Sequence, residues 1–353
     1  MIEAAPALMR RRVYAANRSA QVLRKAAKWA LGMAVWSLLA LPTHAHADWS
    51  AVAESKLLFT SDVFQFSAAR RLSLQEDPTQ PTKVEVNRPQ DTVLEPALEV
   101  TRSSSNRLPT EVSARAQGFI FTEHSAFNHG MYRLTVRQAL SPDTAVSVRY
   151  RYTPHLFLGP NFERRSGQRL IEEERVTSHI GRLQLEHRLT DAWTVTMIGR
   201  GGLRLFNEPF AERDTQFWTV GPEVGYKMTP RVTLGLGYLF ERGLADGRDQ
   251  PQFNDDVSYL NHFVSFKADL QLTAPLTLSL GYNYQRNVFT SELAADPLNG
   301  REDDTHQGTA EFQYALTEAS SLTLGFQRTQ RETNKGTGDF QVTNGWIGGR
   351  VRF

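Results

Sequence analysis

Residues 276–285 read Leu-Thr-Leu-Ser-Leu-Gly-Tyr-Asn-Tyr-Gln, and this stretch decides the fold. Leucine or tyrosine occupies every second position, with small or polar residues between. A period of two is typical of a β-strand with two unlike faces, and about ten residues is the length of a strand that crosses a membrane. The same alternation recurs in residues 232–240, 146–152 and 322–327.

Short turns of one recurring form separate these strands. An apolar residue is followed by Ser or Thr and by two polar or turn-forming residues at 140–143, 189–192, 228–231, 272–275 and 316–319. Because Pro and Asp favour turn geometry, each predicts a tight hairpin. Longer polar stretches lie between the hairpins, at residues 155–172, 207–213, 242–255, 287–303 and 332–338. Short turns at one end and long loops at the other are typical of an outer-membrane β-barrel, with the short turns in the periplasm.

The strand count follows from extending this pattern toward the N-terminus. It adds a turn at residues 106–109, a short loop near 123–129, and an opening hairpin with strands around 61–67 and 93–103. We therefore predict an all-β protein, a closed antiparallel transmembrane barrel of about fourteen strands, with twelve and sixteen as alternatives. A soluble β-sandwich would have shorter strands, of about 5–6 residues, and an apolar core. Here one face of nearly every strand is polar.

The N-terminal segment predicts export. Seven basic residues precede an apolar run at residues 29–42, and Ala45-His46-Ala47 follows it. This order is typical of a Sec signal peptide, so we expect cleavage after Ala47 and a single barrel domain over residues 48–353. A membrane anchor is less favoured because the run is shorter than the roughly 20 residues that a spanning helix needs.

The net charge and the cysteine content exclude several classes of function. Removing residues 1–47 takes away seven basic residues and one acidic residue, so the formal charge changes from +2 to −4. The basic balance therefore belongs to the signal and does not indicate nucleic-acid binding. The absence of cysteine excludes disulfides, a lipid-anchored Cys and Cys-ligated metals. We predict no cofactor and no metal.

Two features carry a family resemblance. Residues 61–64 (Ser-Asp-Val-Phe) and 91–100 are similar to the first hairpin of the porin-like outer-membrane β-barrel superfamily, some members of which accompany exopolysaccharide systems. The chain also ends on Phe353, and stepping back by twos gives the outward face Val351, Gly349 and Ile347. A strand that ends on an aromatic residue resembles the signal read by the outer-membrane assembly machinery. The resemblance implies a Gram-negative outer membrane, with lipid and lipopolysaccharide as neighbours.

The polar parity of the strands predicts the lining of the lumen. In the first half it is rich in arginine: Arg115, Arg133, Arg137, Arg149, Arg151, Arg182, Arg188, Arg200 and Arg204. The counter-charges are Glu95, Glu99, Glu186, Glu223, Asp269 and Glu311, and the second half adds Lys227, Glu241 and Lys267, with Arg350 and Arg352 beside the closure. Guanidinium groups offer planar donor forks to carboxylate, phosphate or sulfate, so we predict a porin-like channel for small anionic solutes or oligosaccharides. Alternatively, the arginines pair with these acids and brace a filled lumen.

Acidic, aromatic and histidine residues bear on functions other than a channel. Acidic side chains cluster in the loops. They either bind divalent cations that bridge to lipopolysaccharide or form a solvated surface, and we favour the solvated surface. These residues are Glu172, Glu173, Glu174, Glu208, Glu212, Asp246, Asp249, Asp255, Asp256, Glu302, Asp303 and Asp304. Aromatic residues at strand ends indicate interfacial girdles: Tyr150, Tyr152, Trp193, Trp218, Tyr226, Tyr282 and Tyr284. His179, His187 and His262 have lipid-facing parity and no recognisable nucleophile motif accompanies them, so we do not predict an enzyme. A structural or assembly barrel of an envelope or exopolysaccharide-export complex is the principal alternative, and an outer-membrane hydrolase is less favoured.

Overall fold

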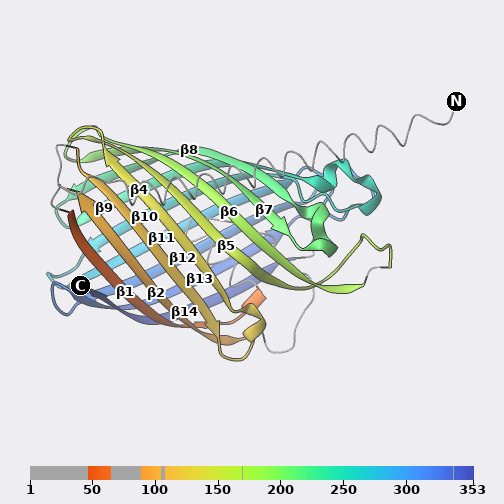
Figure 1. Cartoon of the computed structure of the whole chain (residues 1–353), viewed down its shortest axis with the longest axis horizontal. Helices are drawn as coiled ribbons and strands as arrows, with labels where there is room; N and C mark the ends of the chain where they lie inside the picture. Colours follow the sequence, from red (N-terminus) through yellow and green to blue (C-terminus); the bar gives the residue numbers. More distant parts are fainter. Residues whose placement is uncertain (1–46, 65–88, 105–107, 169, 337) are drawn as a thin grey trace. The chain divides into compact units, whose positions relative to one another are not determined.

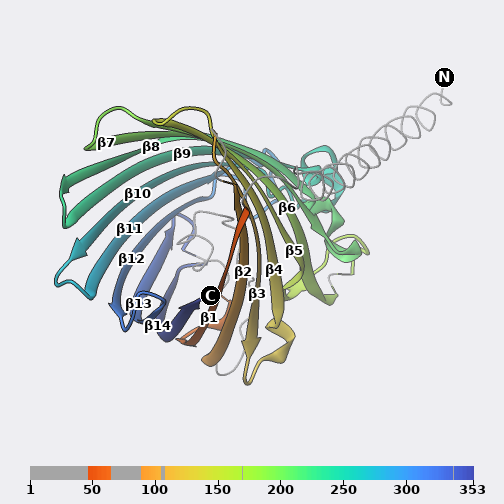
Figure 2. The same ribbon diagram turned by 60° about the vertical axis from the view of Figure 1, so that its left-hand side comes forward.

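The computed structural model describes residues 47–64, 89–104, 108–168, 170–336 and 338–353. These residues form one closed barrel in which every strand pairs antiparallel with its neighbours in sequence (Figures 1 and 2). β1 pairs with β14 and closes the sheet, for example through Ala53 opposite Val351 and Leu57 opposite Ile347. The prediction of fourteen strands is confirmed. The signal peptide and its cleavage lie outside the described residues, apart from Ala47 itself.

The bounds of the strands are β1 Ala47–Thr60, β2 Asp91–Ser104, β3 Thr110–Phe121, β4 His129–Ala139, β5 Thr144–Phe162, β6 Ile171–Arg188, β7 Trp193–Phe206, β8 Thr215–Thr229, β9 Val232–Ala245, β10 Tyr259–Gln271, β11 Leu276–Phe289, β12 Glu302–Ala315, β13 Ser320–Thr333 and β14 Phe340–Arg352. Four short 3-10 helices lie in the loops: η1 Ser125–Phe127, η2 Glu208–Arg213, η3 Asp246–Asp249 and η4 Pro251–Phe253. In the part of the chain that is described, no helix has the length and apolar character needed to cross a membrane.

The two ends of the barrel differ, as the sequence predicts. The five expected hairpins connect β4 to β5, β6 to β7, β8 to β9, β10 to β11 and β12 to β13. Four of them contain the same backbone hydrogen bond. The N–H of the apolar residue that opens the turn donates to the carbonyl oxygen four positions later, as in Leu272 N–H to Leu276 O at 2.9 Å and Leu316 N–H to Ser320 O at 2.9 Å. The longer connections, with all four 3-10 helices, gather at the opposite end.

Two predicted boundaries are wrong. The first strand is β1, which begins at Ala47 and ends at Thr60, so residues 61–64 follow it rather than open it, and residues 65–67 lie outside the described residues. Similarly, residues 155–162 are not loop, because β5 continues to Phe162 beyond a bulge and pairs with β6. In both places polar or turn-forming residues interrupt the alternation, and pairing with the neighbouring strand nevertheless keeps the backbone extended.

The two faces of the sheet have the predicted alternation. On β2, Leu94 and Leu98 are exposed on the outside while Val93, Glu95 and Ala97 are buried on the inside. A closed barrel satisfies all strand hydrogen bonds between neighbours, so its outer face can be apolar and meet lipid. Toward the end with the long loops, part of the interior is filled by an apolar cluster: Leu58, Val63, Val93, Phe119, Phe121, Phe127, Phe157 and Trp346.

Candidate functional site: the lumen

Arginines stand directly opposite one another on the inner face of five successive strands. Arg115 on β3 is the register partner of Arg133 on β4, which is the partner of Arg151 on β5. Two residues along β5, Arg149 is opposite Arg182 on β6, which is opposite Arg200 on β7. We call these two sets the arginine rows. Like charges directly opposite in a sheet are destabilising, so the rows require carboxylates or anions nearby.

The first row meets carboxylates from β1 and β2. Arg115 Nη2 lies 2.6 Å from Glu54 Oε2, and Arg115 Nη1 lies 3.7 Å from Glu99 Oε2. Arg133 Nη2 contacts the same Glu99 oxygen at 2.7 Å. Arg350 on β14 reaches the other oxygen of Glu54 at 3.5 Å. Glu54 is therefore a central counter-charge that the sequence analysis missed, because the first strand was placed after it.

The second row ends at Glu241 on β9, which lies on the inner face as its parity predicts. Arg200 Nη2 lies 3.0 Å from Glu241 Oε2, and Arg204 Nη2 lies 3.4 Å from Glu241 Oε1. The hydroxyl groups of Thr219 and Tyr259 also donate hydrogen bonds to this carboxylate. All three charged side chains are almost completely buried, so this end of the row is a paired and braced structure.

The two remaining predicted arginines lie near the short turns. Arg137 Nη2 is 2.7 Å from Glu186 Oε1, and both side chains are about half exposed. Arg188 pairs with Asp143 of the β4–β5 turn at 2.5 Å. These two therefore belong to the rim of the barrel rather than to its narrow interior.

Three further predicted counter-charges contact other polar side chains of the inner face. Glu95 accepts a hydrogen bond from Gln117 Nε2 at 2.5 Å. Asp269 pairs with Lys267 on its own strand at 2.7 Å and accepts a hydrogen bond from Ser279 Oγ at 2.6 Å. Glu311 on β12 lies 3.1 Å from Lys56 Nζ of β1, a strand that is not adjacent to it, and accepts a hydrogen bond from Trp346 Nε1. The ion pair between Lys56 and Glu311 therefore spans the two intervening strands, β13 and β14, on the inner face.

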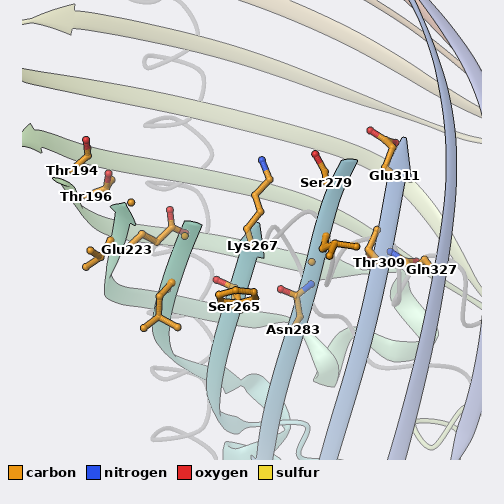
Figure 3. Close-up of a pocket in the computed structure, with 18 of the residues that line it drawn as sticks. Thr194, Thr196, Glu223, Ser265, Lys267, Ser279, Asn283, Thr309, Glu311 and Gln327 are labelled. Carbon is orange, nitrogen blue, oxygen red and sulfur yellow. The ribbon is translucent and has the colours of Figure 1, made fainter. Parts of the chain in front are cut away.

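A cavity of about 600 Å³ opens against the other wall, which is formed mainly by β7 to β14 (Figure 3). In Figure 3 the ammonium group of Lys267 has Glu223 to one side and Ser279 and Glu311 to the other. Glu223 is thus placed in this wall. None of the residues that line the cavity is a member of the arginine rows. The interior accordingly has a basic wall on β3–β7 and a mainly neutral polar wall facing the cavity.

Three histidines on the outer face share a repeated arrangement. His179 Nδ1 is 2.7 Å from the hydroxyl of Tyr150, and His262 Nδ1 is 2.8 Å from that of Tyr238. A third pair joins His306 and Tyr282 at 2.7 Å, so the motif occurs on three pairs of adjacent strands: β5 with β6, β9 with β10, and β11 with β12. The predicted girdle residues Trp193 and Tyr226 stack near the short turns, with ring centroids 4.3 Å apart.

The loop acids are only partly a solvated surface. That interpretation is wrong for five of them, which are buried: Glu174, Glu212, Asp255, Asp256 and Asp303. Arg213 of η2 pairs with two of these buried acids. It lies 2.7 Å from both Glu174 and Asp255, and so connects η2 to β6 and to the segment before β10. Among the described residues, no group of three or more acidic or histidine side chains is arranged to hold a metal ion.

With this geometry, the chain has the fold of a porin-like outer-membrane β-barrel. Residues 252–353, which include β10–β14, match the family model described as "Putative beta-barrel porin 2". The outer membrane channel DcaP of Acinetobacter baumannii is similar, with 11% sequence identity, a TM-score of 0.52, and coverage of 88% of this chain and 97% of that chain.

Two other solved structures resemble the chain more weakly. OmpT, an outer membrane protein of Vibrio cholerae, has 9% identity, a TM-score of 0.48, and coverage of 87% of this chain and 97% of its own. The anion-selective porin from Comamonas acidovorans has 8% identity, a TM-score of 0.43, and coverage of 88% and 100%. No curated protein sequence matches the chain. At such low identity the likeness concerns the fold alone.

Proposed function

We propose that this barrel is an outer-membrane channel for small anionic solutes, including acidic oligosaccharides, and that the arginine rows form its selective wall. The observation that carries the proposal is the register of Arg115, Arg133 and Arg151 and of Arg149, Arg182 and Arg200, each directly opposite the next. The similar fold of DcaP, which is an outer membrane channel, supports the channel part of the proposal.

The physical argument concerns the cost of gathering like charges. Six guanidinium groups are held in two rows across five strands, and three of them pair with Glu54, Glu99 and Glu241. The proposal is that the rows keep an excess of positive charge, which the interior of the barrel screens less than bulk water does. An anion that passes along this wall lowers the repulsion between the rows. Planar guanidinium forks also match carboxylate, sulfate and phosphate oxygens. The wall therefore favours anions over cations.

The test is planar-bilayer conductance of the refolded protein without residues 1–47, with the reversal potential measured in a KCl gradient. We expect anion-selective ion steps. The double variant Arg149→Gln/Arg182→Gln removes two charges that face each other, so it should lower the anion preference without unfolding the sheet. The matched control is Arg286→Gln/Arg328→Gln, which removes the same charge from the outer face, where Arg286 pairs with Glu302 and Arg328 bonds to Gln341.

Two outcomes would contradict the proposal. A refolded barrel that gives no ion steps is not an open channel, and its interior is the braced lumen of the alternative interpretation. Ion steps whose anion preference is the same in the wild type and in Arg149→Gln/Arg182→Gln would show that the arginine rows do not select the solute.

A further inference from the structure

Half of the residues in one inward row, on the wall that faces the cavity, are glycines. Thr194, Gly225, Gly235, Lys267, Gly281 and Thr309 are successive register partners from β7 to β12. Three of the four neighbours nearest to Lys267 along this row are therefore glycines. The Lys267 side chain therefore projects inward between Gly235 and Gly281 and lines the cavity (Figure 3), and its ammonium group pairs with Asp269 at 2.7 Å.

Packing does not require these glycines. A Cβ atom would meet its nearest heavy atom at 3.9 Å at Gly225 and at 3.7 Å at both Gly235 and Gly281, which are ordinary van der Waals contacts. By contrast, a Cβ at Gly325 in the same barrel would lie 2.1 Å from the Trp346 ring. Since larger residues fit the backbone at the three positions, what glycine provides there is empty volume.

The wall of this volume offers hydrogen-bonding groups of both kinds. Hydroxyl and amide side chains line it, namely those of Thr194, Thr196, Ser265, Ser279, Asn283, Thr309 and Gln327. Three buried wall atoms have no hydrogen-bond partner among the described residues: Glu223 Oε1, Thr309 Oγ1 and Gln327 Nε2. Gln327 is 1% exposed. Buried polar atoms without partners are rare in folded proteins, and these three are an acceptor, a hydroxyl and a donor.

The charges of the cavity differ from those of the arginine rows. Two cations, Lys56 and Lys267, and two carboxylates, Glu223 and Glu311, line it. A balanced set of charged and neutral hydrogen-bonding groups suits a solute with many hydroxyl groups, because each hydroxyl both donates and accepts. The volume of about 600 Å³ is within the range of roughly 300–1,000 Å³ typical of small-molecule sites.

We propose that this cavity is a saccharide-binding site, which we call the glycine-row site, and that it holds hydroxyl-rich sugar rings while the arginine rows attract the charge of an acidic solute. The inference deepens the proposed function, and it requires only that the cavity is open to solutes from one end of the barrel. It assigns Lys267, Glu223 and Gln327 to the recognition of hydroxyl groups.

The experiment compares a neutral trisaccharide, cellotriose, with an acidic one, trigalacturonic acid, by isothermal titration calorimetry with the refolded protein. Gly235→Leu and Gly281→Leu each fill the cavity. They should weaken binding of both trisaccharides about tenfold, which corresponds to the loss of one or two hydrogen bonds. Gly199→Leu is the control, because this glycine lies on the outer face opposite Leu183 and nothing lies within 4 Å of its Cβ position. Lys267→Gln leaves the volume of the cavity nearly unchanged and removes the ammonium group. It should therefore weaken the binding of both trisaccharides.

The outcomes separate the two proposals. Arg149→Gln/Arg182→Gln should weaken the binding of the acidic trisaccharide and leave the binding of the neutral one unchanged. Anion-selective ion steps without binding of either trisaccharide, or equal binding by the wild type and by folded Gly281→Leu, would overturn the saccharide site and leave the channel intact. Binding of both trisaccharides that Gly281→Leu weakens, in a barrel without ion steps, would support the site and overturn the channel.

Discussion

The hydroxyl group of Tyr259 donates a hydrogen bond to Glu241 Oε1 over 2.6 Å and accepts one from Arg204 Nη1, also over 2.6 Å. Tyr259 on β10 thus joins a carboxylate on β9 to an arginine on β7. With Arg200 and Thr219 completing the set, every oxygen of Glu241 has donors. A buried carboxylate is stable only with this degree of compensation.

Removing Glu241 should therefore destabilise the barrel strongly. Glu241→Ala leaves Arg200 and Arg204 buried without their carboxylate, and breaking a buried pair costs about 3–5 kcal/mol. The measurement is urea unfolding of the refolded protein in lipid vesicles. Glu186→Ala, which breaks the half-exposed pair with Arg137, is the control and should cost at most about 1 kcal/mol. Equal losses in the two variants would contradict the braced structure around Glu241.

The loop end should be sensitive to pH through Glu212 of η2. Burial raises the pKa of this carboxyl from 4.5 to about 7, and nearby Asp255 adds to the rise against the opposing effects of Arg213 and Arg165. The folded protein therefore holds a proton that the unfolded chain has released, so stability falls as pH rises from about 4.5 to about 7 and then levels.

Hydrogen exchange of the loop containing η2 is the appropriate measurement, and protection should be greater at pH 5 than at pH 8. Glu212→Gln should abolish this difference because it cannot ionise. Glu208→Gln is the control, since the Glu208 side chain is largely exposed and should leave the pH dependence in place. A pH dependence that persists in Glu212→Gln belongs to another group.

Gly221 should tolerate no side chain. A Cβ there would lie 1.9 Å from the Tyr238 carbonyl oxygen, which is backbone and cannot rotate away. Gly221→Ala should therefore separate β8 from β9 locally and lower the free energy of unfolding by about 1–3 kcal/mol. Gly199→Ala, with nothing within 4 Å, should change it little. A wild-type urea midpoint for Gly221→Ala would contradict the close approach of the two strands.

The terminal aromatic residue should matter for assembly more than for stability. The backbone of Phe353 pairs with Ala51 through bonds of 2.8 and 3.1 Å, whereas its side chain is 74% exposed. We propose that the ring is recognised by the assembly machinery, so Phe353→Ala should reduce insertion in cells while refolding of purified protein into vesicles stays normal. A refolding defect of similar size in vesicles would instead assign the ring a role in the barrel itself.

The fold could be predicted from local sequence because its physical requirements are local. Each strand in lipid needs an apolar outer face, so the alternation in residues 276–285 predicts both the strand and its orientation. The turn motif at residues 272–275 then fixes where neighbouring strands meet. The prediction of β1 was wrong because it too relied on local alternation. Trp49, Leu57 and Phe59 lie on the outer face of β1, but small residues lie between Trp49 and Leu57 on that face and weaken the pattern.

The sequence by itself determined the barrel, the two faces of its strands and the inward placement of arginine between β3 and β7. Only the tertiary structure decided which charges meet, because register and closure bring together residues that are far apart in the chain. Lys56 reaches Glu311 across two intervening strands, and Arg115 meets Glu54 across one. The open cavity beside Lys267 likewise depends on Gly225, Gly235 and Gly281 falling into one row, and that alignment exists only once the strands are paired.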